Sequence, residues 1–175
     1  MSERQELKVA VAVIGAGSAG LNVFRGAQKH TESVVLIEGG PYGTTCARVG
    51  CMPSKLLIAA AEAAHDIERA HGFGVHAEPP VINGLEVMDR VRRERDRFVG
   101  FVLEDTGAIP EPQRIRGYAR FLDDHTLQVD DHTRIHADRI VIATGSTPSI
   151  LPMFEGLGDR LVINDNVFSW IDLPE

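Results

Sequence analysis

Cysteine is scarce in this sequence: its 175 residues include two, Cys46 and Cys51, which lie five positions apart. Long apolar runs are also missing. The longest, "VAVAVIGAG" from Val9, is far shorter than the roughly 20 residues of a membrane helix. The polar start "MSERQELK" is not that of a signal peptide. We therefore expect a cytoplasmic protein without a membrane partner, a setting in which two cysteines do not serve as a structural staple.

An excess of positive charge is absent as well. The sequence has 18 Lys and Arg residues and 25 Asp and Glu residues, which gives a net charge of −7. The one basic run, "RVRRERDRF" from Arg90, is interrupted by Glu94 and Asp96, which is typical of a solvated helix face. The sequence therefore predicts no nucleic-acid partner. Its length suits one domain with a full core and is too short for two comfortable ones.

The chain opens with the pattern of a βαβ unit. "LKVAVAVIG" (Leu7 to Gly15) and "SVVLIE" (Ser33 to Glu38) are apolar and β-branched, as strands buried on both faces of a parallel sheet are. The segment Ser18 to His30 between them predicts a helix. "DRIVIATGS" (Asp138 to Ser146) predicts a third strand of the same kind.

Two long helices are predicted between these strands. One runs from Pro53 to His71 with proline at its first position, and the other from Leu85 to Gly107. The inward positions of the second are expected to be Leu85, Met88, Val91, Phe98 and Val102. From Arg114, the short alternating segments "RIRGYARFL", "TLQVD" and "TRIHA" predict a small antiparallel meander, and the tail after Ser146 is expected to be loop-like. These elements predict an α/β fold with a small antiparallel β-meander.

The motif "GAGSAG" places Gly15, Gly17 and Gly20 in the G-x-G-x-x-G spacing of dinucleotide-binding proteins. It follows a predicted strand, opens a predicted helix, and precedes Glu38 by 18 residues, counted from Gly20. In such a site Gly15 permits the tight turn, Gly17 lets the backbone approach a pyrophosphate, and Gly20 lets the helix pack close to the strand. The carboxylate of Glu38 accepts from ribose hydroxyls, which favours FAD or NAD over NADP.

The two cysteines can pair only if the backbone between them leaves the helical conformation. Residues five apart in a helix are separated by about 7.5 Å along its axis, whereas a disulfide tolerates Cα separations up to about 6.8 Å. Gly50 and Pro53 permit such a departure. A loop this short adds only about 2 kcal/mol of stability, so redox chemistry is the better reason for the pair. Cys51 precedes a helix N-terminus and Lys55, which both favour a thiolate. Two free cysteines remain an alternative, and no metal site is predicted, since no ligand pair nearby completes a zinc set.

Taken together, these motifs identify a resemblance. The glycine fingerprint, the acid at Glu38, "GTTCARVGCMPSK" with its C-x4-C spacing, and the later "ATG" resemble the pyridine nucleotide–disulfide oxidoreductases, and most closely their dihydrolipoyl dehydrogenase branch. The resemblance covers essentially the whole chain. It implies a Rossmann-like FAD/NAD(P)-binding fold that is incomplete here, as an N-terminal fragment. It also implies an enzyme, a flavoprotein that links a small dithiol, disulfide or lipoyl group to FAD and NAD(H).

The resemblance also assigns roles to individual residues. Cys46 matches the interchange thiol, Cys51 the thiol against the flavin ring, and Lys55 the lysine beside the flavin. Contacts to the pyrophosphate and ribose fall on Gly15, Gly17, Ser18 and Glu38. Tyr118 and Ala119 match the adenine end, and Ala143, Thr144 and Gly145 the turn that closes over the cofactor. The remaining members of the predicted cofactor site are Ala19, Thr45 and Gly50.

Two departures from the family pattern stand beside the cysteines. Thr44 replaces the second glycine of the usual "GGTC", which affects how closely the backbone approaches the flavin. Arg48 replaces the usual asparagine and places a cation near the sulfur pair, where it alters thiolate stability or substrate preference on our hypothesis.

The family also implies parts that this sequence does not contain. A second fingerprint for NAD and a dimerisation domain with a catalytic histidine are expected in the longer homodimeric enzyme. We accordingly interpret residues 1–148 as the first part of an FAD-binding domain and 149–175 as a linker toward an NAD-binding domain. On this interpretation the chain by itself is inactive. None of the seven histidines is assigned a role, and all are expected at the surface or in loops.

Two other functions remain open. The first is the same family acting on mercuric ion or a small disulfide. The second is a non-catalytic nucleotide-binding or redox-sensing domain.

Overall fold

The structure is a computed structural model, and it describes residues 5–174. The chain divides into two compact units. The first comprises the chain up to Thr45 together with Phe101–Thr147, and the second comprises Cys46–Gly100 and the chain from Pro148 onward. The polar start of the sequence lies partly outside the described residues.

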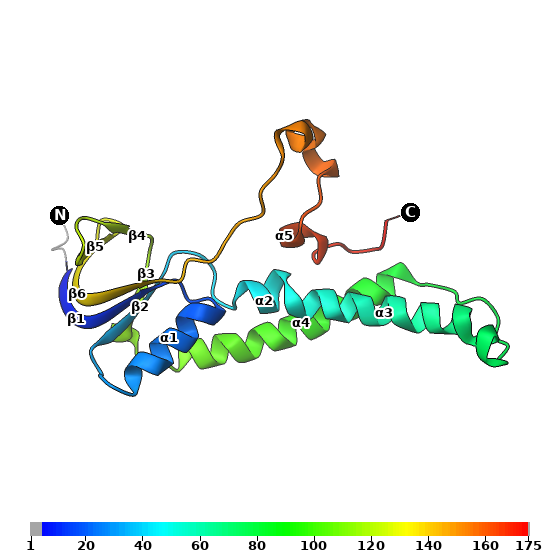
Figure 1. The fold of residues 1–175 in the computed structure, drawn as a ribbon, viewed down its shortest axis with the longest axis horizontal. Helices are drawn as coiled ribbons and strands as arrows, with labels where there is room; N and C mark the ends of the chain where they lie inside the picture. The colour runs from blue at the N-terminus through cyan, green and yellow to red at the C-terminus, as the bar shows by residue number, and fades with distance from the viewer. Residues whose placement is uncertain (1–4, 175) are drawn as a thin grey trace. The chain divides into compact units, whose positions relative to one another are not determined.

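The first unit contains a six-stranded sheet in the order β3-β2-β1-β6-β5-β4 (Figure 1). The strands are β1 (Gln5–Ile14), β2 (Val34–Glu38), β3 (Arg114–Arg116), β4 (Ala119–Phe121), β5 (Thr126–Val129) and β6 (Thr133–Ile142). β3, β2, β1 and β6 are parallel, whereas β5 and β4 continue the sheet in antiparallel pairing. The mixed α/β class with an antiparallel meander is thereby confirmed.

Two details of the sheet differ from the prediction. "RIRGYARFL" contains two strands, of which β3 pairs in parallel with β2 rather than joining the meander. "TRIHA" and "DRIVI" form the single strand β6, which pairs with β1 along its length and with β5 near its start. A three-residue strand carries too little pattern to reveal its partner, and a strand shared by two neighbours has no break for the sequence to mark.

β3 and β4 are opposite edges of the sheet, yet only Gly117 and Tyr118 separate them in the chain. The sheet must therefore curl until its edges approach each other. Gly117 has a φ of +139°, and a β-carbon there would collide with Asp130 and Val129. Residues of β1, β2, β5 and β6 pack inside this curl in one apolar cluster.

The helix α1 (Ser18–Gln28) packs on the sheet through a second cluster that includes Val13, Leu21 and Phe24. Val102 packs against this same cluster, so that prediction is correct. It belongs to the last turns of the long helix α4 (Gly84–Gly107), the part that lies in the first unit.

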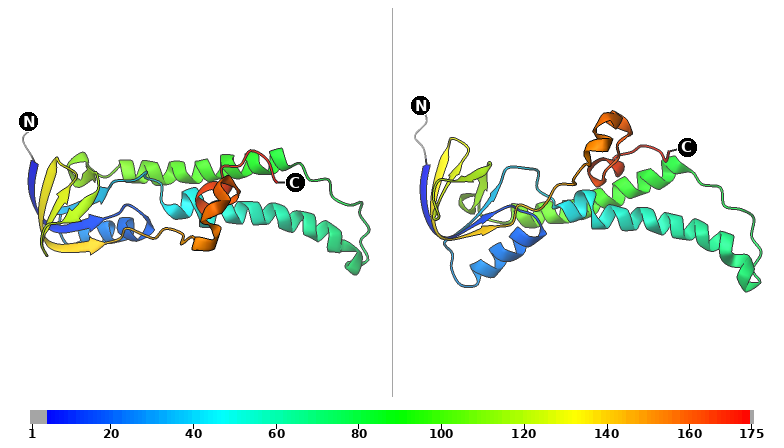
Figure 2. Two further views of the ribbon diagram at one scale, coloured as in Figure 1. Left: turned by 90° about the horizontal axis from the view of Figure 1, so that it is seen from above. Right: turned by 45° about the horizontal axis from the view of Figure 1, so that its top comes forward.

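The second unit contains α2 (Thr45–Val49), α3 (Cys51–Arg69) and the start of α4; α3 and α4 run in opposite directions (Figure 2). Arg90 joins them by donating to the carbonyl of Leu56 at 3.2 Å. α3 begins at Cys51, two residues before the predicted Pro53. Met88 and Val91 are fully buried as expected, whereas Leu85 is exposed, because it occupies the first turn of α4.

The remaining elements are short helices: η1 (Ala70–Phe73), η2 (Glu111–Gln113), η3 (Pro152–Arg160) and α5 (Asn164–Val167). The tail is thus more ordered than the loop that its composition predicts. No helix among residues 5–174 is both long and apolar enough to cross a membrane.

Candidate functional site

In the first unit, most predicted cofactor-binding residues meet at the carboxyl ends of parallel strands. Gly15 follows β1 and donates its N–H to the carbonyl of Ile37 at 2.8 Å. Ala143 follows β6 and donates to the carbonyl of Ile14 at 2.8 Å. In open α/β sheets, ligands bind outside this edge.

The glycine turn has the geometry that its spacing predicts. Gly15 has a φ of +106°, and a β-carbon at this position would collide with the carbonyl of Ala143. At Gly20 a β-carbon would collide with the carbonyl of Gly15, so α1 approaches the turn as closely as a backbone can. At Gly17, by contrast, an added β-carbon would have no other atom within 4 Å. The tight turn and the close packing are therefore present.

The N-terminus of α1 faces outward from this turn. Gly17 is its N-cap and no side chain caps the helix. Ser18 and Ala19 are exposed. The first N–H groups of a helix lack partners within the helix and carry partial positive charge, so an anion is favoured there.

Glu38 is held in place by the backbone. One of its carboxylate oxygens accepts from the N–H of Ala16 at 2.7 Å, and the other accepts from the N–H of Gly40 at 2.7 Å. The carboxylate thereby ties the glycine turn to the loop after β2. Each oxygen can accept more than one hydrogen bond, so the same group remains able to accept from a ligand hydroxyl.

The ring of Tyr118 lies against the backbone beside Glu38. A β-carbon at Gly39 would stand 2.5 Å from Cδ1 of this ring, and Tyr118 is 71% exposed. The backbone N–H of Tyr118 donates to Asp130 at 3.2 Å, which fixes the start of the meander. Ala119 is half-buried and packs against the core inside the curl. An exposed aromatic ring over a glycine is a surface on which a base can stack.

Arg116 also belongs to this edge, although the sequence did not single it out. Its guanidinium donates to the carbonyl of Gly40 at 2.6 Å and lies 4.7 Å from the ring centroid of Tyr42. Because Arg116 pairs with Glu38 across β2 and β3, the register places it here. No local sequence signal carries that register.

Thr144 and Gly145, predicted to close over the cofactor, are exposed, and Gly145 has a φ of +74°.

In the second unit, the two cysteines flank a break between two helices. α2 ends at Val49, and Gly50 takes a φ of −129° and a ψ of −117°, outside the helical range. α3 then begins at Cys51. The departure from a helix that pairing requires is therefore present, and Gly50 provides it. Pro53 lies within α3 as a buried residue.

Both cysteines are free thiols, and their side chains are close enough to interact. The hydrogen bond to the side chain of Cys51, with burial, raises the pKa of Cys46, although the charge of Lys55 opposes this. Cys46 is half-buried and Cys51 is exposed. A hydrogen bond from the backbone N–H of Cys51, at the start of α3, also opposes the rise in the pKa of Cys46. Lys55 follows one helical turn later and is exposed.

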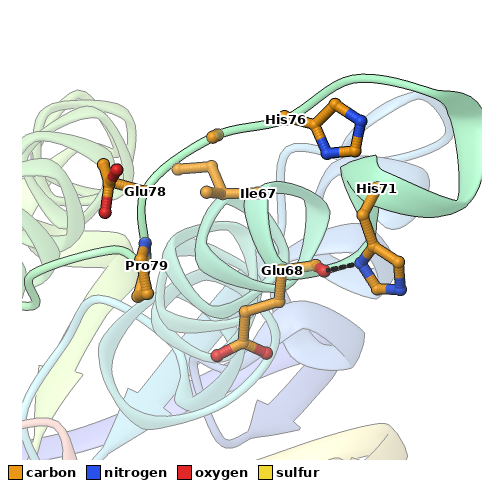
Figure 3. Close-up of a pocket in the computed structure, with 7 residues that line it drawn as sticks. Ile67, Glu68, His71, His76, Glu78 and Pro79 are labelled. Atoms are coloured by element: carbon orange, nitrogen blue, oxygen red, sulfur yellow. Dashed lines mark hydrogen bonds between the residues drawn. The ribbon is translucent and has the colours of Figure 1, made fainter.

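All seven histidines are exposed, as expected. Two of them, His71 and His76, line a hollow of about 360 Å³ near the end of α3, together with Glu68 and Glu78 (Figure 3). His71 is engaged with the carbonyl of Glu68 at 2.8 Å. Within residues 5–174 no three His, Cys, Asp or Glu side chains are arranged to hold a metal ion. None of the predicted site residues lines this hollow.

Comparison with known proteins places these features in context. A profile of the pyridine nucleotide-disulphide oxidoreductases matches residues 9–171. Dihydrolipoyl dehydrogenase 2 from Haloarcula marismortui is 33% identical over 172 residues, which are 93% of this chain and 35% of that protein. A mercuric reductase from Shigella flexneri is 38% identical over 159 residues, which are 85% of this chain and 27% of that protein.

Among solved structures, the HOCl-induced flavoprotein disulfide reductase RclA from Escherichia coli superposes with a TM-score of 0.64 at 25% identity. The match covers 82% of this chain and 29% of that one. The chain thus spans about a third of the length of the relatives that it matches.

Proposed function

This chain belongs to the pyridine nucleotide-disulphide oxidoreductase family, and we propose that it is the FAD-binding, cysteine-bearing part of a dihydrolipoyl dehydrogenase-like oxidoreductase. The observation that carries the proposal is the placement of two free thiols, Cys46 and Cys51, on either side of the break at Gly50. Two thiols whose side chains are close enough to interact need little movement to form a disulfide. Oxidation of the pair forms one S–S bond and releases two protons and two electrons.

The residues of the first unit fit FAD. The open backbone at Gly17 and the uncapped start of α1 suit a pyrophosphate. The fixed carboxylate of Glu38 suits ribose hydroxyls, and the exposed ring of Tyr118 suits the adenine end. When bound, FAD supplies a two-electron acceptor for the dithiol. This chain's own part is to bind the nucleotide and to hold the exchanging sulfurs.

The two sulfurs have different roles in this proposal. Cys46 exchanges with a substrate dithiol or disulfide, as a thiolate when it attacks, and Cys51 faces the flavin. Lys55, Thr45 and Gly50 complete the surroundings of the pair. Residues 1–148 form the first part of the FAD-binding domain and 149–175 lead toward an NAD-binding domain. We further propose that the complete protein is a cytoplasmic homodimer that passes electrons between a lipoyl group and NAD(H).

Mercuric ion is the second candidate substrate. Mercuric reductases match this chain at 35% to 38% identity, and dihydrolipoyl dehydrogenases match it at 31% to 33%. Two neighbouring free thiols also suit a soft metal ion.

Activity assays on the complete protein separate the two substrates. It should reduce NAD⁺ with dihydrolipoamide and should not oxidise NADPH or NADH with mercuric ion. The reverse result would assign the enzyme to the mercuric branch. Reversible thiol oxidation without activity on either compound, and without flavin binding, would instead support a redox sensor.

A further inference from the structure

Two arginines of α4 hold a segment near the end of the chain, residues 164–171. Arg95 donates to the carbonyl of Phe168 at 2.8 Å, and Arg92 donates to the carbonyls of Trp170 and Ile171. Phe168 is 6% exposed and anchors the segment by its side chain. Arginine side chains bound to backbone carbonyls fix the path of a segment largely independently of its sequence.

The first residue of this segment reaches the cysteine loop. Asn164 opens α5, and its side-chain amide donates to the carbonyl of Val49 at 3.2 Å. The same nitrogen donates to Asp165 at 3.2 Å, which fixes the orientation of the amide. The last carbonyls of a helix lack partners within it, so this bond satisfies a group at the end of α2.

The carbonyl of Val49 belongs to the planar peptide group that joins Val49 to Gly50, at the break between α2 and α3. Rotation of this plane changes the break between α2 and α3, and with it the separation of the sulfurs on either side. A bond that holds the carbonyl therefore restrains the geometry of the pair.

We propose that Asn164 is a positioning residue for Cys46 and Cys51: its amide fixes the Val49–Gly50 peptide and so keeps the two thiols placed for pairing. The inference rests on the proposed redox function of the pair. Because preorganised thiols form a disulfide more readily, loss of this bond shifts the equilibrium toward the dithiol.

The test uses the whole chain without flavin. It is equilibrated with mixtures of reduced and oxidised glutathione, in which one protein dithiol and one glutathione disulfide give one protein disulfide and two glutathione thiols. Alkylation and mass spectrometry measure the disulfide fraction. Asn164→Ala and Asn164→Asp both lack the donor. Each should lower the equilibrium constant for disulfide formation about three- to tenfold, which corresponds to the free energy of one hydrogen bond.

Asn166→Ala is the matched control. Asn166 lies in the same short helix and caps it by accepting from the N–H of Ile163 at 3.0 Å, but it donates to Leu161 rather than to α2. Its equilibrium constant should stay within twofold of the wild type, although this variant also loses hydrogen bonds of α5. Equal constants for Asn164→Ala and the wild type would overturn the inference alone. A wild-type chain that forms no reversible disulfide would overturn the proposed function as well.

Discussion

The carbonyl oxygen of Gly15 occupies the position that a β-carbon at residue 20 would need. No rotamer change can relieve such a collision, because both partners are backbone. α1 and the turn before it are therefore locked at a spacing that only glycine allows, and the start of α1 is set close to the end of β1. This fixed relationship positions the proposed pyrophosphate site.

Gly20→Ala should lower the free energy of unfolding by at least about 2 kcal/mol, since the backbone must shift to admit the methyl group. Gly26→Ala is the control in the same helix, because nothing lies within 4 Å of its added β-carbon. The free energy of unfolding of that variant should rise by up to about 1 kcal/mol. Urea unfolding measures both, and equal effects of the two substitutions would contradict the packing described here.

Glu38→Gln should weaken both the fold and the binding of FAD. The amide keeps one acceptor oxygen, so one of the two backbone N–H groups, of Ala16 or Gly40, loses its partner. We expect a loss of about 1–3 kcal/mol in the free energy of unfolding and at least a tenfold weaker FAD affinity by fluorescence titration. Unchanged affinity would show that this carboxylate does not contact the cofactor.

Thr44→Gly should stabilise the chain. Thr44 has a φ of +57°, which a β-branched residue adopts only under strain. Glycine removes this strain and restores the residue typical of the family, for an expected gain of about 1 kcal/mol. Thr45→Gly, at the next residue and inside α2, should instead destabilise. Thermal or urea unfolding of the two variants checks that their changes in stability have opposite signs. Stabilisation by both substitutions would contradict backbone strain at Thr44.

Cys51→Ala should make Cys46 reactive at lower pH. The hydrogen bond to Cys51 is the largest cause that raises the pKa of Cys46, and the substitution removes it while Lys55 remains to lower that pKa. The pH midpoint for alkylation of Cys46 by iodoacetamide should therefore fall. Cys51→Ser retains a hydrogen-bonding group and should move the midpoint less. A midpoint that rises in Cys51→Ala would exclude the thiol contact.

Local patterns were sufficient to predict the βαβ unit, the fingerprint turn and the two long helices. In each, the periodicity or the glycine spacing acts over neighbouring residues, as at Gly15 and Gly20. The same patterns predicted that pairing of Cys46 and Cys51 requires a break in the helix, permitted by Gly50 and Pro53, and the structure has this break at Gly50.

Features that depend on pairing between distant segments could not be predicted. β3 joins β2 through three residue pairs, and Arg116 reaches the loop after β2 only because of that register. α2 is a five-residue helix in a Gly- and Thr-rich loop, too short to show periodicity. The bond from Asn164 to Val49 spans 115 positions, and nothing near either residue marks it.

The most direct test of the redox centre is a visible absorption spectrum of the chain with FAD, recorded before and after reduction by dithiothreitol. The wild type should gain a long-wavelength charge-transfer shoulder on reduction, because the sulfur of Cys51 would then lie against the flavin as a thiolate. Cys46→Ser should retain that shoulder and Cys51→Ser should lose it. Bound flavin whose spectrum is the same in all three proteins would contradict a redox centre formed by these two cysteines.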